Sequence, residues 1–132
     1  MQYRRLGNTG LLVSVLSYGN FNSRELIPLE EQVKIIKTCL QNGINYFDTA
    51  EIYTAGKDEE DLGKVLAEIK EPRENYVIST KVWTAPNPDI NSKTGTSRKH
   101  VKESLKGSLK RLQLDYADIV FAHSYDQETP IE

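Results

Sequence analysis

Short apolar stretches alternate with amphipathic helical segments along the chain, and this alternation is the feature that most restricts the fold. The apolar stretches lie at residues 15–20, 44–47, 76–80 and 114–122. Apolar residues recur at helical spacing in the segments between them, 28–42, 58–69 and 97–112. Strands that alternate with helices in this way pair in parallel and are joined by right-handed crossovers. The sequence therefore predicts an α/β fold.

Both ends of the chain extend this pattern. Residues 3–14 hold two short apolar stretches around the turn residues 7–10, which predicts a β-hairpin. After the fourth strand, Thr129 is a candidate helix cap with Pro130 in the first turn. We expect residues 1–132 to form one unit with a hairpin, four parallel strands, three helices and the start of a fourth helix.

The helical segment 97–112 carries both an apolar stripe and many basic residues. The apolar stripe is expected to face the core and consists of Val101, Leu105, Leu109 and Leu112. The basic residues are expected to form a solvated outer face, on which we also place His100: Arg98, Lys99, Lys102, Lys106, Lys110 and Arg111. Acidic neighbours dilute this face and the formal net charge is -2, so we expect no nucleic-acid partner.

Composition narrows the class of protein. The chain is 38% hydrophobic and 27% charged, which is typical of one soluble α/β unit. It has no run of 18 apolar residues and no apolar segment near its start, so we expect a cytoplasmic protein. The single Cys39 lies in a helical pattern and reads as a buried structural thiol rather than a reactive one. Neither histidine has a partner at metal-ligand spacing, so no metal is expected.

Three polar residues follow the predicted strands at the points where each strand ends. Asp48, Lys81 and His123 are separated by 33 and 42 residues, roughly one βαβ unit each. Tyr53 lies five residues after Asp48. Because the carboxyl ends of parallel strands lie on the same side of the sheet, we expect the four side chains to converge.

Together these side chains suit proton transfer to a carbonyl oxygen. A free phenol has a pKa of about 10, so a tyrosine is a weak acid near neutral pH unless a cation stabilises the phenolate. Lys81 is the candidate cation for Tyr53, and Asp48 would pair with the ammonium group. His123 would hydrogen-bond the substrate oxygen. Taken singly, each residue is more often an ordinary loop or strand-end residue, and their common position favours the catalytic interpretation.

The run Asp-Thr-Ala-Glu-Ile-Tyr-Thr-Ala-Gly-Lys at residues 48–57, with Lys81 and His123, resembles the aldo-keto reductases and in particular their voltage-gated potassium-channel beta-subunit branch. The resemblance covers nearly the whole chain. It implies the N-terminal half of a (β/α)8 TIM barrel, because a complete barrel needs about 250 residues. It also implies that Tyr53 is the general acid, that Lys81 and Asp48 tune it, and that His123 orients the carbonyl.

The resemblance further implies a cofactor and a substrate. NADPH is the expected hydride donor, and a small aldehyde or ketone is the expected substrate. The residues that match the nicotinamide contacts are Gly19, Asn20, Phe21 and Asp48. Asn20 stands where the family has threonine. The residues that match the substrate pocket are Tyr53, Trp83 and His123.

The predicted half barrel limits what the chain alone can do. Phosphate sites in such barrels commonly form at the loops after strands seven and eight, so we expect weak NADPH binding by this chain. The first and fourth strands of a half barrel lack a neighbour on one side, which favours self-association or pairing with a complementary half.

Two functions remain open from the sequence. The first is NADPH-dependent reduction of aldehydes or ketones with Tyr53 as general acid. The second is a regulatory or structural role like that of the channel beta subunits, which dock on the cytosolic domain of a membrane channel, with catalysis lost because the C-terminal half is absent. Residues beyond Glu132 that carry a phosphate-binding loop would favour the enzyme. The substrate and the oligomeric state are not specified by this sequence.

Overall fold

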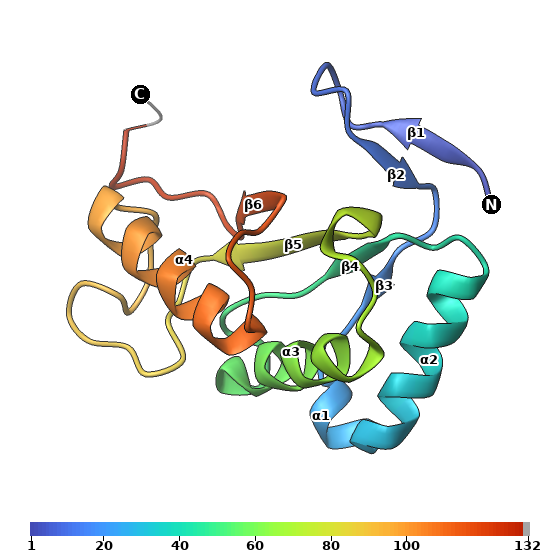
Figure 1. Cartoon of the computed structure of the whole chain (residues 1–132). Helices are drawn as coiled ribbons and strands as arrows, with labels where there is room; N and C mark the ends of the chain where they lie inside the picture. Colours follow the sequence, from blue (N-terminus) through green and yellow to red (C-terminus); the bar gives the residue numbers. More distant parts are fainter. Residues whose placement is uncertain (131–132) are drawn as a thin grey trace.

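A four-stranded parallel sheet forms the centre of the computed structural model, which describes residues 1–130 (Figure 1). The strand order is β3-β4-β5-β6. The strands are β3 (Tyr18–Gly19), β4 (Tyr46–Asp48), β5 (Val77–Val82) and β6 (Ile119–Ala122). Before them, β1 (Tyr3–Arg5) and β2 (Leu12–Ser14) form an antiparallel hairpin. The predicted α/β class and the N-terminal hairpin are therefore confirmed.

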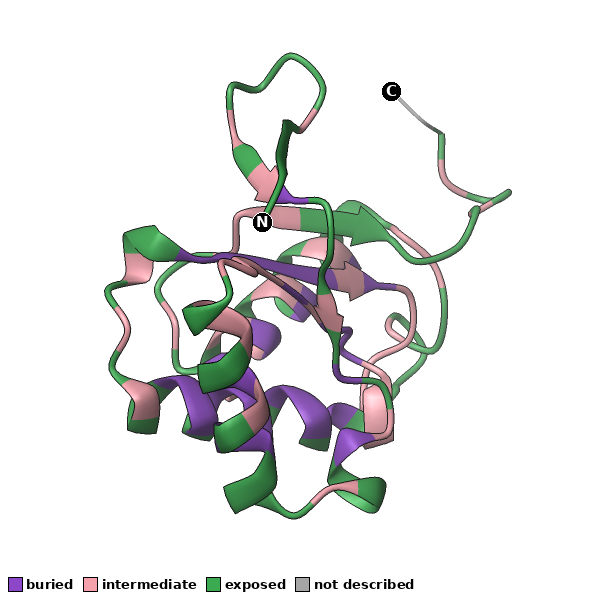
Figure 2. Ribbon diagram, turned by 90° about the vertical axis from the view of Figure 1, so that its right-hand side faces the viewer, coloured by how far each residue is buried: buried purple, intermediate pink, exposed green. Residues whose placement is uncertain are grey.

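The main helices lie together on one side of this sheet (Figures 1 and 2). They are α2 (Leu29–Gln41), α3 (Lys57–Ile69) and α4 (Arg98–Leu112). Shorter helical turns are α1 (Ser23–Leu26), η1 (Tyr53–Gly56) and η2 (Arg73–Asn75). No helix among residues 1–130 is long and apolar enough to cross a membrane.

A single apolar core fills the space between the helices and the sheet. Its fully buried side chains include Ile36 from α2, Phe47 from β4, Leu62 from α3 and Ile78 from β5. Burying a side chain of this size contributes about 1.5–3 kcal/mol. Cys39 packs partly buried against this core, and burial raises the pKa of its thiol, in keeping with a structural role.

The hairpin attaches to the sheet at the end opposite the predicted site. The Asn45 side chain accepts a hydrogen bond from the Ser14 amide at 2.8 Å and donates one to the Leu12 carbonyl at 3.1 Å. Asn45 directly precedes β4, so these bonds lie at the amino end of the strand. The carboxyl ends of the strands, which we call the rim, are left clear of the hairpin.

The predicted inward stripe of α4 is confirmed at Leu112 and is wrong by one residue at its other three positions. The buried residues of this helix are His100, Ser104, Ser108 and Leu112, spaced four apart. The residues Val101, Leu105 and Leu109 are only half-buried. The cause is the close packing of α4 on α3, where small side chains allow the backbones to approach. His100, which we expected on the outer face, is 2% exposed and lies inside.

Several element boundaries also differ from expectation. The first core strand is reduced to two residues, and Val15 and Leu16 before it are exposed. The short helix α1 was not predicted. The fourth strand begins only at Ile119, after a segment held by an ion pair between Arg73 and Asp118 at 2.6 Å. The helix predicted to begin near Thr129 and Pro130 would continue through 131–132, which lie outside the described residues.

The outer strands of the sheet have no further strand partner within residues 1–130. On β6, Val120 and Phe121 are each 40% exposed, so apolar side chains of this strand remain uncovered. Exposed strand edges with apolar side chains are surfaces on which further strands pair.

Candidate active site

The register of the sheet brings the predicted site residues to the rim. Asp48 ends β4 and lies opposite Ser79 of β5, and Lys81 follows two residues later on the same side of that strand. His123 directly follows β6, where its amide donates to the Val82 carbonyl at 3.0 Å. Side chains two residues apart on a strand point the same way, so Ser79 and Lys81 both reach Asp48.

The ammonium group of Lys81 is the centre of this arrangement. Its Nζ donates to Asp48 Oδ2 at 2.6 Å, to the Thr49 carbonyl at 2.8 Å and to Tyr53 Oη at 3.0 Å. The other carboxylate oxygen of Asp48 accepts a hydrogen bond from the Ser79 hydroxyl. An ammonium has three donors, and all three are used here. The lysine is therefore fixed in position beside the phenol oxygen.

This contact leaves the Tyr53 proton available. In the Lys81 bond the phenol oxygen is the acceptor, so its own hydrogen is free to be donated to another molecule. The adjacent positive charge stabilises the phenolate that would remain after that donation. The geometry therefore suits a proton donor.

A tight turn holds the Tyr53 ring in place. Thr54, Ala55 and Gly56 have φ values of 44°, 52° and 82°, which reverse the chain before α3 begins. Only glycine adopts this left-handed region without cost. The ring then packs edge-on against Phe21, with centroids 4.9 Å apart, and against His123, with centroids 5.8 Å apart.

The environment of His123 favours a neutral imidazole. Burial lowers the pKa of this histidine below its ordinary value, and the positive charge of Lys81 lowers it further. The negative charges of Asp48 and Glu51 act in the opposite direction without cancelling this effect. A neutral imidazole carries one N–H, which can donate to a carbonyl oxygen.

Two substitutions should move the His123 pKa in opposite directions. Lys81→Met removes a charge that lowers this pKa, so it should rise toward the ordinary 6.5. Asp48→Asn removes a charge that raises the pKa, so it should fall further. Because the folded-state pKa is depressed, the stabilisation from neutral His123 is present above pH 6.5 and is lost as the pH falls through the folded-state value. NMR titration of the imidazole measures both shifts, and shifts of equal sign would contradict this account.

An open hollow lies at the rim beside these groups. It measures about 460 Å³ and is lined by Ser17, Gly19, Tyr46, Asp48, Lys81, Phe121, Ala122 and His123. A side chain on Gly19 would meet no atom within 4 Å, so the space above this residue is free. The hollow combines apolar walls with the polar groups described above, as ligand sites commonly do.

Of the four residues predicted to contact a nicotinamide, Asp48 lines the hollow, and the three at the end of β3 differ in their placement. Gly19 lines the hollow, and Phe21 is 63% exposed beside the Tyr53 ring. Asn20 is buried, and its Nδ2 donates to the Asp58 carbonyl at 2.8 Å. Its amide nitrogen is thus bonded to the start of α3, while its Oδ1 has no hydrogen-bond partner among residues 1–130.

Trp83 lies apart from the rim hollow. It lines a neighbouring pocket of about 510 Å³ together with Ile90 and Tyr125, between the loop 84–96 and the segment after β6. The structure therefore brings Asp48, Tyr53, Lys81 and His123 together and leaves Trp83 beside a different cavity. Among residues 1–130, no group of three or more His, Cys, Asp or Glu is arranged to hold a metal ion.

Three buried carboxylates near the site were missed by the sequence reasoning: Glu51, Asp58 and Glu59. Asp58 accepts hydrogen bonds from the amides of Asn22 and Arg24, both at 2.9 Å, and from Thr54 Oγ1 at 2.9 Å. It thereby ties the loop after β3 to the turn that carries Tyr53. A surplus of acids in the first turn of a helix usually indicates solvated residues, so the pattern gave no sign of burial.

Comparisons with known proteins identify the family of this chain. A sequence model described as the Aldo/keto reductase family matches residues 16–132. A probable voltage-gated potassium channel subunit beta from Arabidopsis thaliana is 44% identical over 136 aligned positions, which cover all of this chain and 40% of the relative. A protein of the same description from Oryza sativa subsp. japonica is 43% identical, and the match again covers all of this chain and 40% of the relative. The chain thus spans about 40% of the length of these relatives.

A solved structure shows the same fold. The crystal structure of a Pseudomonas aeruginosa protein assigned as an aldo-keto reductase superposes with a TM-score of 0.78 at 36% sequence identity. The match covers 95% of this chain and 48% of that one. A (β/α)8 barrel has eight repeats, so a match to about half of it corresponds to the four strands described here.

Proposed function

This chain belongs to the aldo/keto reductase family, and from that premise we propose that the protein carrying it reduces aldehydes or ketones with NADPH. The observation that carries the proposal is the position of Lys81 Nζ, 3.0 Å from Tyr53 Oη and 2.6 Å from Asp48 Oδ2. We also expect the protein to act in the cytoplasm on small carbonyl compounds.

In the proposed reaction Tyr53 donates its phenol proton to the carbonyl oxygen of the substrate. Lys81 stabilises the phenolate left behind, and Asp48 keeps the ammonium in place. His123, held neutral, donates a hydrogen bond to the same carbonyl oxygen and so orients the substrate. Proton donors placed in this way typically contribute about 10²–10⁴-fold to a rate.

The residues present fit the nicotinamide end of the cofactor. The open space above Gly19 and the exposed ring of Phe21 would accept a flat ring beside Tyr53. Asp48 lines the same hollow. When bound, the cofactor supplies the hydride, and the chain's own residues supply the proton. Asn20 would contribute by holding the loop through its bond to Asp58 rather than by direct contact.

A direct test is an assay of the full-length protein for NADPH oxidation with a panel of aromatic and aliphatic aldehydes. We expect turnover with at least one aldehyde and substrate-dependent loss of absorbance at the nicotinamide band. The same assay with NADH measures the choice of cofactor. Absence of turnover across the panel, in a protein that binds NADPH, would overturn the proposal.

A channel-associated role is the second candidate, because the relatives from Arabidopsis thaliana and Oryza sativa are described as potassium channel beta subunits and match the whole chain. Under this proposal the protein binds the cytosolic domain of a membrane channel. Co-purification with such a domain by a protein that lacks reductase turnover would favour it. Turnover without co-purification would favour the enzyme.

A polypeptide of these 132 residues alone should associate and should bind NADPH weakly. The exposed apolar residues of β6, and the edges of β3 and β6 that have no strand partner within residues 1–130, are surfaces for pairing with a second copy or a complementary half. The phosphate loops of such barrels usually follow later strands. Size-exclusion chromatography with light scattering and a fluorescence titration with NADPH measure both properties. A stable monomer that binds NADPH with micromolar or tighter affinity would contradict this prediction.

A further inference from the structure

Glu51 is a fully buried residue that lies between Asp48 and Tyr53 in the sequence. The proton-transfer scheme does not use its carboxylate. Its Oε1 accepts a hydrogen bond from the Trp83 amide at 2.7 Å. Its Oε2 accepts one from the Ser104 hydroxyl at 2.5 Å. A buried charge is costly unless such bonds compensate for the lost water. The presence of this charge in the interior therefore needs an explanation.

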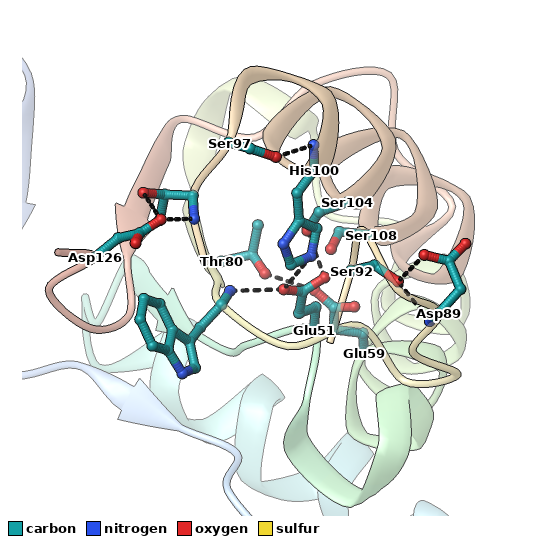
Figure 3. Close-up of polar contacts among 12 residues, drawn as sticks. Glu51, Glu59, Thr80, Asp89, Ser92, Ser97, His100, Ser104, Ser108 and Asp126 are labelled. Carbon is teal, nitrogen blue, oxygen red and sulfur yellow. Dashed lines mark hydrogen bonds and ion pairs between the residues drawn. The ribbon is translucent and has the colours of Figure 1, made fainter. Parts of the chain in front are cut away.

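The partners of Glu51 on α4 are themselves buried. His100 and Ser104 lie one helical turn apart, and His100 Nε2 is 3.4 Å from Glu51 Oε1 (Figure 3). Among residues 1–130, neither ring nitrogen of His100 has a hydrogen-bond partner, so its approach to Glu51 is a contact rather than a hydrogen bond. The imidazole and the hydroxyl thus both face the same carboxylate, which fastens α4 to the loop between β4 and η1.

The bonds of Glu51 also hold the backbone directly after the Lys81 side chain, on both sides of Val82. The Glu51 amide donates to the Lys81 carbonyl at 3.3 Å, and the Glu51 carboxylate accepts from the Trp83 amide two residues further along. The end of β5 is therefore bonded to one residue at two points. That residue is only two positions before Tyr53, so a shift of Glu51 would move Lys81 and Tyr53 relative to each other.

We propose that Glu51 is a positioning residue: anchored on α4 by the Ser104 hydroxyl, its carboxylate fixes the end of β5 so that Lys81 stays in contact with Tyr53. The catalytic part of this inference rests on the proposed reductase function. The structural part, the fixed position of Lys81, does not depend on it. The carboxylate acts through its bonds to the Trp83 amide and the Ser104 hydroxyl, and it does not line the rim hollow.

Glu59 provides a matched comparison. It is equally buried and accepts a hydrogen bond from Thr80 Oγ1 at 2.6 Å (Figure 3). It also accepts one from Arg111 Nε at 2.7 Å. Both of its partners are side chains, so it does not hold the backbone around Lys81. Removing Glu59 should disturb the packing between α3 and α4 without moving the rim.

The first arm of the test needs no reaction. The protein is treated with the amine-acetylating reagent N-hydroxysulfosuccinimide acetate, and the labelling rate of each lysine is measured by peptide mass spectrometry. In Glu51→Ala we expect Lys81 to be labelled at least about fivefold faster than in the wild type and the Trp83 amide to exchange faster with deuterium, because the amide loses its acceptor and the end of β5 that carries Lys81 loses this restraint. In Glu59→Ala both should stay within about twofold of the wild type.

The second arm measures steady-state kinetics of the full-length protein. Displacements of about 1 Å can cost about 10²-fold in rate, so Glu51→Ala should lower kcat by roughly 10- to 100-fold with little change in KM. Glu51→Gln keeps an acceptor oxygen for the Trp83 amide and should retain at least about a third of the wild-type kcat. Glu59→Ala should keep kcat near that of the wild type.

The outcomes separate the two proposals. If the wild type reduces no carbonyl, the reductase function fails and the labelling arm alone decides the position of Lys81. If Glu51→Ala does not fold, Ser104→Ala removes the α4 anchor alone, and we expect a smaller increase in Lys81 labelling, about twofold. Equal labelling of Lys81 in the wild type and in the folded Glu51 or Ser104 variants, or equal effects in Glu51→Ala and Glu59→Ala, would overturn the positioning role.

Discussion

Replacing Tyr53 with phenylalanine is expected to lower carbonyl turnover by about two orders of magnitude or more. The substitution removes the hydroxyl that lies 3.0 Å from Lys81 Nζ and keeps the ring that packs against Phe21 and His123. No other phenol among the described residues hydrogen-bonds this ammonium, so no second proton donor takes over. Steady-state assays with the preferred aldehyde measure the loss.

Cofactor binding provides the control for this variant. The dissociation constant for NADPH should change by less than about threefold, because the ring and the hollow remain. Tyr116→Phe is a matched substitution elsewhere, since Tyr116 is half-exposed and packs on Arg73 at a ring distance of 3.9 Å. It should leave kcat unchanged. Full turnover in Tyr53→Phe would show that the proton comes from another group.

Gly63→Ala should destabilise the protein although alanine favours helices. A Cβ at this position in α3 would lie 2.6 Å from the Arg111 carbonyl oxygen and 2.7 Å from the Leu112 backbone of α4. Backbone atoms cannot move aside as a side chain can, so overpacking at the upper end of its usual range, about 3 kcal/mol, outweighs a gain of about 1 kcal/mol in helix propensity. The expected net loss in unfolding free energy is about 2 kcal/mol, measured by chemical denaturation.

Gly107→Ala tests the same substitution in the other helix. There the nearest atom to a new Cβ is Nη1 of Arg111 at 3.1 Å, the end of a flexible side chain. The propensity gain should dominate, and the unfolding free energy should rise by about 0.5–1 kcal/mol. The decisive result is a change in unfolding free energy of opposite sign for the two substitutions. A stabilised Gly63→Ala protein would mean that α3 and α4 pack less closely than described.

The order of strands and helices and the convergence of the rim residues were predictable because they depend on periodicity and on spacing. Asp48, Lys81 and His123 each follow an apolar stretch. Because the strands are parallel, all three residues must lie at the rim, where the carboxyl ends of the strands are. The contact between Lys81 and Tyr53 then follows from the short turn after β4. These are properties of the local sequence and of the topology.

The buried face of α4 was not predictable from periodicity. Serine and histidine read as polar, so the rule that apolar residues point inward selected Val101, Leu105 and Leu109 instead. What decided the face was a partner far along the chain, Gly63 of α3, which allows close approach and is indistinguishable in sequence from any other helical glycine. The roles of Glu51 and Asn20 depend on such distant partners too. Glu51 is bonded to Trp83 and Ser104. Asn20 is bonded to Asp58.

The register of β4 with β5 has a consequence for the order in which the site assembles. Asp48, Tyr53 and Lys81 all lie within residues 46–82, a single βαβ unit, so their contacts close only short loops of chain. The entropy of loop closure rises slowly with length, and His123 must wait for α4 and β6 to be added. The contact between Tyr53 and Lys81 can therefore form while the chain is still being synthesised. His123 joins them only after β6 has been added to the sheet.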